Sequence, residues 1–484
     1  MPKEAAFSRS RNGCLECRAK HLKCDEHQPK CTFCSERTLL CRYPSELKWV
    51  HSSRPILFRH RSRRPRVDEN RIGLYRRIPS SACNEPFQGN EDRRAWEYYV
   101  RLVSSNIPAI DGPNNPYRQL SFTALTTPIL LETVLCIATE HMLNFNMGDV
   151  STAARHQQQL LRSISLRLKA IEENQNQNLI RASRATGHLD HEALLTAIIL
   201  QGVVVVQTAD GVLEPHIRCA AFLMEKLDYF HRLPQGELLR TAIQRFAMVD
   251  VMLAVSRQRR PFSPRDFVLH LPDTETWDLT EPSFHKMTGC PQPLMCLFVR
   301  IIHLACDVDE SVEQRESTVH NLNQAYALEN DLRAWGSQYG VGFQPSPRQR
   351  DPLDILSECF YWTAHLLLAR RVFHDSTYSL RVQHTARTCF ELMDQLATGI
   401  GPDSSLPQPF YLAAREAITA EDRAWVRQKH DSMTDYYREQ QRHRAMELTQ
   451  RIWAIVDGNV GNGYNLESEA MIQSLDRQSD LFIF

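Results

Sequence analysis

The pattern of apolar and polar residues along the chain changes near residue 93. From there to about residue 456, apolar side chains recur at intervals of three and four, the spacing of one buried face of an α-helix. Only Val203 to Val206 reads as a strand, and it adjoins a helical run. The pattern therefore predicts a large all-α domain over residues 93–456. Its stripes are Trp96, Tyr99, Val100 and Val103; Leu131, Val134, Leu135 and Ala138; Leu160, Ile164, Leu168 and Ile171; Leu239, Ile243 and Phe246; Leu328, Leu332 and Trp335; and Leu448, Ile452 and Val456.

Cap and turn residues divide this helical region. Thr127 followed by Pro128 predicts an N-cap with proline at the first helical position. Gly336 is expected to stop the helix that precedes it, so residues 336–352 are predicted to form a loop. The polar tract 173–178 is predicted to form another.

The segments before residue 93 lack this periodicity. Residues 1–13 form a basic arm, and residues 45–92 contain four prolines and few apolar positions, which predicts a linker. Five arginines fall within residues 59–66, and we interpret them as a nuclear-import signal, with a phosphate-tracking arm or a solvated loop as alternatives. No heptad repeat follows, so dimerisation would need another surface.

The C-terminal segment, residues 457–484, mixes acidic and bulky apolar residues. It holds five acidic residues against one arginine and ends in Asp-Leu-Phe-Ile-Phe. This composition is typical of activation segments, whereas a packed C-terminal strand or helix end would explain it equally well. Both interpretations stay open from the sequence.

Charge is distributed unevenly along the 484 residues. The totals of 57 Lys+Arg and 57 Asp+Glu cancel, but residues 1–66 hold 16 basic and 6 acidic residues, which leaves 41 and 51 for the remainder. The chain thus joins a part of net charge +10 to a part of net charge −10, as expected for a basic arm that binds nucleic acid or a membrane. The longest apolar run, residues 197–206, is far shorter than the ~20 residues that span a bilayer. With no apolar signal segment at the start, we expect an intracellular, soluble protein without a membrane partner.

Cysteine spacing is the most specific feature of the sequence. Six of the fourteen cysteines form two C-x2-C-x6-C units that are related by a shift of 17 residues. A closed zinc site takes four ligands, so one zinc on the two C-x2-C pairs would leave the third cysteine of each unit unused. Two zinc ions need eight ligand positions, which six thiolates supply if two of them bridge both metals. The sequence predicts a binuclear zinc cluster on Cys14, Cys17, Cys24, Cys31, Cys34 and Cys41.

Three stretches around these cysteines resemble the fungal Zn(2)-Cys(6) zinc-cluster transcription factors. They are GCLECRAKHLKCDE at residues 13–26, PKCTFC at 29–34 and CRYP at 41–44. The resemblance implies a small module of two short helices with loops over residues 14–44, in which the first and fourth cysteines, Cys14 and Cys31, bridge the metals. It also implies that the helix after the second cysteine enters the major groove of double-stranded DNA and reads a CGG-type half-site.

The basic stretch between the second and third cysteines carries the expected DNA contacts. It contains no glycine or proline and can form one to two helical turns. We expect Lys20 and Lys23 to contact bases or lie near them, and Arg18 and the exit residue Arg42 to contact phosphates. His21 departs from the Lys or Arg of many relatives, and because neutral imidazole carries no charge, base preference at this contact stays open.

The helical region is similar to the regulatory domain that follows the cluster in the same family. The similarity lies in the Trp- and Tyr-rich first helix, the Pro-Ile-Leu-Leu run at 128–131 and Arg260-Pro261 upstream of Asp266. It implies a nuclear, sequence-specific transcription factor acting on RNA polymerase II genes, with activation favoured. Its partners would be DNA and transcription machinery or co-regulators, and a homodimer is possible. The alternative is a zinc-stapled interaction adaptor that does not bind DNA, but an adaptor would not need the basic stretch 18–23.

Motifs of enzyme chemistry are absent from the sequence. It contains no G-x-S-x-G, no phosphate-binding P-loop and no H-E-x-x-H. The run from His188 to Glu192 lacks a further partner at metal spacing, and the run from Asp307 to Glu310 starts like a calcium loop but has Val312 at the glycine position. We therefore expect surface residues at both places and no enzyme activity.

Overall fold

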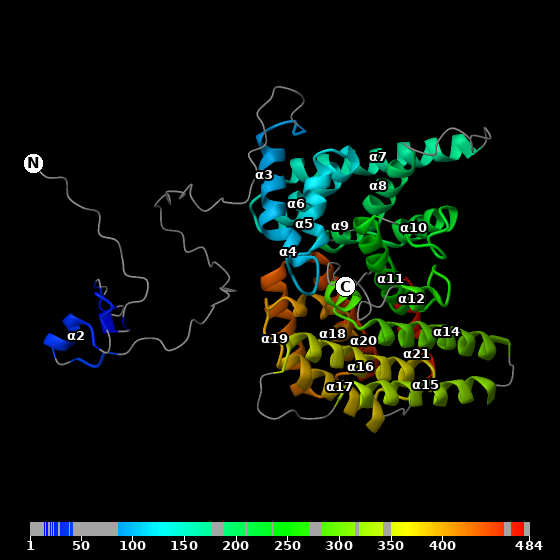
Figure 1. Cartoon of the computed structure of the whole chain (residues 1–484). Helices are drawn as coiled ribbons and strands as arrows, with labels where there is room; N and C mark the ends of the chain where they lie inside the picture. The colour runs from blue at the N-terminus through cyan, green and yellow to red at the C-terminus, as the bar shows by residue number, and fades with distance from the viewer. Residues whose placement is uncertain are drawn as a thin grey trace, which may run out of the picture. The chain divides into compact units, whose positions relative to one another are not determined.

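The computed structural model divides the chain into two compact units, Met1–Val67 and Asp68–Phe484, each of which is described by itself (Figure 1). The residues that the structure describes are 14, 16–17, 20, 22, 24–27, 30–37, 39–41, 86–175, 187–208, 211–234, 236–271, 283–314, 319–341, 350–458 and 466–478. In the smaller unit, the described residues form the helix α2 (Thr32–Glu36), a helical turn that includes Glu16 and Cys17, and loops.

The larger unit is helical, and its described residues contain no strand. Its first helices are α3 (Asn90–Tyr98), the π-helical turn η2 (Tyr99–Val103), α4 (Ser104–Asn106), α5 (Pro116–Ala124), α6 (Pro128–Asn144), α7 (Val150–Gln175), α8 (Gly187–Ile199), α9 (Gln201–Gln207), α10 (Glu214–Lys226), α11 (Glu237–Arg257), α12 (Phe267–His270) and α13 (Phe284–Thr288). They are followed by α14 (Gln292–Gln314), α15 (Val319–Gln338), α16 (Pro352–Arg371), α17 (Leu380–Asp394), the 3-10 turn η3 (Pro402–Ser405), α18 (Pro407–Ala414), α19 (Ala420–Tyr437), α20 (Gln440–Gly458) and α21 (Leu466–Gln478). The all-α prediction for this part of the chain is confirmed.

Two groups of helices pack around α6 and α16 in the larger unit. Helix α6 contacts α3, α5, α7, α8 and α9, while α16 contacts α14, α15, α17 and α18. Helix α11 joins the groups because it contacts α5 and α8 on one side and α14 on the other (Figure 1). Buried residues cover most faces of α6, α11 and α16, as expected for helices at the centre of a large domain.

Local sequence explains several helix starts. Pro128 begins α6 with Thr127 in the N-cap position, as predicted, although the Thr127 hydroxyl makes no capping hydrogen bond. Side chains cap other helices directly: the Asp351 carboxylate accepts a hydrogen bond from the Leu353 N–H at 2.9 Å, and the Thr419 hydroxyl accepts one from the Asp422 N–H at 3.0 Å. These acceptors satisfy N–H groups that have no partner inside the helix.

Packing overrides two local signals. The strand-like run Val203–Val206 lies in α9, where every residue is buried, so tertiary contacts outweigh the preference of valine for strands. The predicted stop at Gly336 is wrong, because α15 continues to Gln338 and Gly336 faces the Tyr361 ring, where a Cβ atom would lie 2.8 Å from ring carbon Cζ. The predicted loops also begin too early or end too late: α7 continues through residue 175, and α16 already begins at Pro352.

Candidate metal centre and nucleic-acid interface

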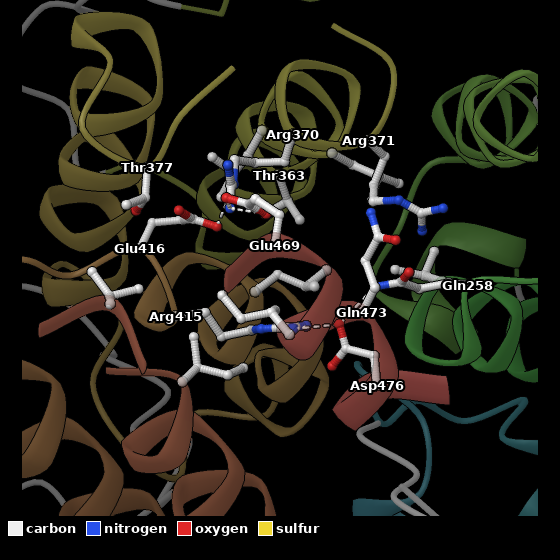
Figure 2. A pocket seen from close by; sticks show the side chains of 17 residues that line it. Gln258, Thr363, Arg370, Arg371, Thr377, Arg415, Glu416, Glu469, Gln473 and Asp476 are labelled. Atoms are coloured by element: carbon white, nitrogen blue, oxygen red, sulfur yellow. Dashed lines mark hydrogen bonds and ion pairs between the residues drawn. The ribbon is translucent and has the colours of Figure 1, made fainter. Parts of the chain in front are cut away.

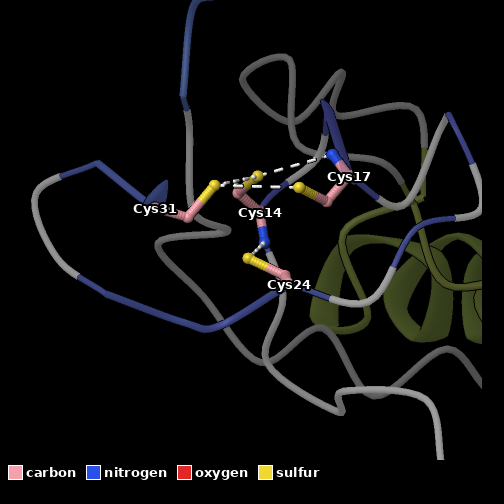
Figure 3. A group of neighbouring side chains, drawn as sticks. All are labelled: Cys14, Cys17, Cys24 and Cys31. Carbon is pink, nitrogen blue, oxygen red and sulfur yellow. Dashed lines mark hydrogen bonds between the residues drawn. The ribbon is translucent and has the colours of Figure 1, made fainter. Parts of the chain in front are cut away.

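The structure gathers the six clustered cysteines into two overlapping groups of four sulfurs. One group contains Cys14, Cys17, Cys24 and Cys31 (Figure 3), and the other contains Cys14, Cys31, Cys34 and Cys41; within each group all Sγ atoms lie within 4.8 Å of one another. Cys14 and Cys31 belong to both groups. They are the two residues to which the family resemblance assigns the bridging role.

The sulfur separations fit zinc. The Cys14 and Cys31 Sγ atoms are 3.7 Å apart, and the Cys14–Cys34 and Cys17–Cys31 Sγ distances are also 3.7 Å. Four sulfurs at the usual Zn–S distance of about 2.3 Å in a regular tetrahedron would lie about 3.8 Å from one another. The donor set and its spacing therefore match two zinc tetrahedra that share an edge.

Backbone hydrogen bonds repeat with the sequence duplication. The Cys14 N–H donates to Cys24 Sγ at 3.4 Å, and the Cys31 N–H donates to Cys41 Sγ at 3.4 Å. The Leu22 N–H donates to the Cys17 carbonyl and the Leu39 N–H to the Cys34 carbonyl, both at 2.9 Å. Each bond maps onto its equivalent by the same shift of 17 residues, so each half of the cluster positions its own third cysteine by the same local geometry.

The enclosed thiols resist full ionisation without a cation. Burial and hydrogen bonds with the neighbouring sulfurs raise the pKa of Cys17 above its ordinary value and that of Cys34 to about 12. Burial also acts to raise the pKa of Cys14, but hydrogen bonds from the Cys17 N–H and from neighbouring thiols outweigh it and lower this pKa to about 6. A bound divalent cation would favour the ionised thiolates, because it would replace their protons and neutralise their accumulated negative charge.

Asp25 connects the two halves of the module. Its two carboxylate oxygens accept hydrogen bonds from the Thr32 N–H at 3.0 and 3.3 Å, and Thr32 is the first residue of α2. Hydrogen bonds from Thr32 lower the pKa of the Asp25 carboxyl group. Because the N–H of the first helical residue has no partner inside the helix, Asp25 of the first half caps α2 of the second half.

Among the predicted DNA-contacting residues, the structure describes Lys20 alone. Lys20 is exposed, and its N–H donates to the Glu16 carbonyl at 3.1 Å, which forms one helical turn across Cys17. Arg18, His21, Lys23 and Arg42 lie outside the described residues. Arg37 was not among the predicted DNA contacts, and its guanidinium carbon lies 4.2 Å from the centre of the Phe33 ring.

In the larger unit, the described acidic side chains of the two runs that resembled metal sites make ordinary polar contacts. Asp307 pairs with Arg260 at 3.0 Å, and Asp309 pairs with Arg371 at 2.7 Å. Glu192 accepts a hydrogen bond from the Tyr229 hydroxyl at 3.3 Å. Among the described helices, none is both long and apolar enough to cross a membrane.

Comparison with protein families identifies the family to which the chain belongs. Residues 94–471 match the family described as "Fungal specific transcription factor domain", and residues 12–50 match the "Fungal Zn(2)-Cys(6) binuclear cluster domain". The chain belongs to the family of fungal-specific transcription factors and carries the zinc-cluster domain of these proteins at its N-terminus. The cluster domain binds two zinc ions, and members of the family are transcription factors, not enzymes.

Curated relatives agree with this class over limited stretches. The chain is 32% identical over 80 residues to a transcriptional regulatory protein of Neurospora crassa, covering 16% of this chain and 10% of the relative. It is 28% identical over 130 residues to an uncharacterized transcriptional regulatory protein of Schizosaccharomyces pombe (25% of this chain, 20% of the relative) and 43% identical over 42 residues to a transcription factor of Flammulina velutipes (9% and 15%). The matches thus span a fifth or less of each relative. No solved structure matches the chain significantly.

Proposed function

We propose that this protein is a nuclear, sequence-specific regulator of RNA polymerase II transcription that reads CGG-like half-sites in DNA. The observation that carries the proposal is the pair of four-sulfur groups sharing Cys14 and Cys31, with the exposed Lys20 on a turn directly after Cys17. A cluster of this kind fixes a short basic helix rigidly enough to be inserted into the major groove.

Each residue of the cluster module has a role in this proposal. Cys14 and Cys31 bridge the zinc ions, and the other four cysteines each bind one. Lys20 and Lys23 contact guanines through O6 and N7, while Arg18 and Arg42 contact phosphates and set the register. His21 stands where a charged contact is common, and it adjusts base preference by a hydrogen bond without a permanent charge.

The charge distribution supports DNA binding by the N-terminal part of the chain and other roles for the remainder. Six thiolates and two zinc ions together contribute about −2, so the metal-loaded residues 1–66 keep a net charge of about +8. The remaining residues carry −10 and would be repelled by DNA. We assign residues 14–44 to DNA binding, 45–92 to a linker with the import signal, 93–456 to regulation, and 457–484 to the recruitment of activating partners.

Substitution of the two lysines tests the reading helix. The zinc-loaded full chain is titrated against a duplex with one CGG triplet and against a scrambled duplex, with fluorescence anisotropy as the readout. Each good base contact contributes about 1–3 kcal/mol of discrimination, so Lys20→Ala combined with Lys23→Ala should abolish the preference for CGG. Affinity for both duplexes should fall steeply with salt, because phosphate contacts release counterions.

Lys30→Ala is the matched control. Lys30 is exposed and carries the same charge, but it lies in the loop between the two halves of the cluster. Its loss should weaken binding to both duplexes alike and leave the preference for CGG in place. An undiminished preference in the Lys20/Lys23 variant would overturn the assignment of the reading helix, and no binding by the unaltered chain would favour the adaptor.

A further inference from the structure

The C-terminal helix α21 lies against helices α11 and α20 of the larger unit and beside the ends of α16 and α18 (Figure 2). A cavity of about 70 Å³ lies between these elements. Arginines and apolar side chains both line it, among them Arg370, Arg415, Leu366, Leu412 and Ile452. We call this arginine-lined surface, without α21, the groove.

Ion pairs hold α21 in the groove. Arg370 of α16 donates to both oxygens of Glu469 at 2.8 and 3.1 Å and to Glu416 at 2.9 Å. Asp476 accepts hydrogen bonds from Arg415 and, at 2.7 Å, from Gln258 Nε2. The Asp476 side chain is only 3% exposed, so these contacts are shielded from water and strongly directional.

Apolar contacts also hold α21, although it buries fewer apolar side chains than the central helices. Among the described side chains of α21, Ile472 is the buried apolar residue, whereas Met471 is 56% exposed. Ile472 packs with Ile452 and Val456 of α20 in a small cluster separate from the main core. By contrast, α11 buries residues from Leu239 to Arg257 on nearly every face. Helix α21 is therefore held by both ion pairs and a small apolar contact, and the ion pairs can be changed by substitution without altering the main core.

The docked face of α21 has a defined chemistry. Glu469, Ile472 and Asp476 occupy positions i, i+3 and i+7, which lie on one side of a helix. In the groove, Arg370 pairs with Glu469 and Arg415 pairs with Asp476, and apolar side chains lie around these arginines. The groove also contains the carboxylate of Glu416, which pairs with Arg370. An acidic helix with one central apolar side chain is thus the ligand that the groove fits.

We propose that α21 is a reversible intramolecular ligand of the groove, and that docking hides an acidic and apolar face that binds co-regulators when α21 is released. The claim that released α21 binds co-regulators, which we call the regulatory half, rests on the proposed function. The claim that α21 docks reversibly in the groove does not. The two interpretations of the C-terminal segment, activation segment and packed helix end, are then two states of the same residues.

Charge exchange across the groove tests the docking in the full chain. Arg415→Glu should increase the hydrogen-exchange rates of the α21 amides at least tenfold and leave those of α6 unchanged. Adding Asp476→Arg should restore slow exchange by rebuilding the pair in reverse. Arg300→Glu is the matched control, because it breaks the 2.7 Å pair with Asp331 at a site on α14 and α15. It should leave α21 exchange unchanged.

A second variant covers the case in which Arg415→Glu unfolds the domain. Glu469→Gln with Asp476→Asn keeps the shape of α21 and removes its docking charges, so α21 exchange should again rise at least tenfold. Exchange as slow as in the unaltered chain would overturn the docking mechanism.

Transcription from a CGG reporter tests the regulatory half. Variants that release α21 should raise reporter output severalfold at equal DNA affinity, and the charge-exchanged pair should return it to the starting level. Equal output from docked and released forms would overturn the masking of a co-regulator site. Failure of the unaltered chain to bind the CGG duplex would refute the proposed function and leave the exchange result standing on its own.

Discussion

Replacing one bridging cysteine should remove more zinc than replacing one terminal cysteine. Cys31 belongs to both four-sulfur groups, whereas Cys41 belongs to one. In the edge-sharing arrangement, six sulfurs make eight zinc–sulfur bonds, so Cys31→Ser breaks two of them and leaves both metals with three sulfurs. Cys41→Ser breaks one bond and leaves the other zinc with all four of its sulfurs, those of Cys14, Cys17, Cys24 and Cys31.

The energetic consequence is large, because metal binding is the folding energy of such a small module. Structural zinc contributes an apparent ~10–16 kcal/mol in single-zinc peptides, and a module of about 30 residues buries too little apolar surface to fold without it. Loss of both metals should unfold residues 14–41, whereas retention of one should preserve the half that holds the reading helix.

Native mass spectrometry of the full chain during titration with a chelator measures this difference. Cys41→Ser should keep at least one zinc at chelator concentrations that strip Cys31→Ser completely. Cys219→Ser, which alters a half-buried thiol of α10 in the other unit, should retain two zinc ions. Equal zinc retention by the Cys31 and Cys41 variants would refute the bridged arrangement.

Three other predictions concern the stability of each unit. Asp25→Ala removes the acceptor of the Thr32 N–H and should let a chelator strip zinc faster, and an unchanged stripping rate would contradict its positioning role. Gly289 has φ +79°, and a Cβ there would lie 2.7 Å from Leu356 Cδ2, so Gly289→Ala should lower the unfolding free energy by about 1–3 kcal/mol in urea; an unshifted midpoint would count against this packing. Burial lowers the pKa of His141 to about 4, so the unfolded chain binds the proton more tightly and stability should fall as the pH drops from about 6.5 to 4. His141→Asn should flatten the dependence of the melting temperature on pH in that range, and an identical slope would show that this histidine is not responsible.

The helices of the larger unit could be predicted from the sequence because their apolar spacing is local. Their ends could not always be predicted, since some depend on distant contacts. Gly336 reads as a helix stop, yet the ring of Tyr361 explains why a glycine stands inside α15. The helix bounds of α15 follow from that packing and not from the propensity of glycine.

The candidate site also has features that could be predicted from the sequence and others that could not. Cysteine spacing alone indicated two metals and six ligands, because the count of thiolates and the tetrahedral preference of zinc leave few arrangements. The contact of Asp25 with Thr32 and the docking of α21 could not be predicted from periodicity. In the groove, Arg370 and Glu469 stand 99 residues apart in the chain, and only the tertiary fold shows that they meet.

Selection of binding sites from random double-stranded DNA tests whether the zinc cluster reads a DNA sequence. The zinc-loaded full chain is incubated with a random-sequence library, and bound DNA is amplified and sequenced over several rounds. We expect enrichment of CGG triplets, and loss of that enrichment when a chelator removes zinc or when Lys20 and Lys23 are replaced by alanine. Recovery of DNA with no enriched triplet, or of the same sequences after zinc removal, would contradict sequence reading by the zinc cluster.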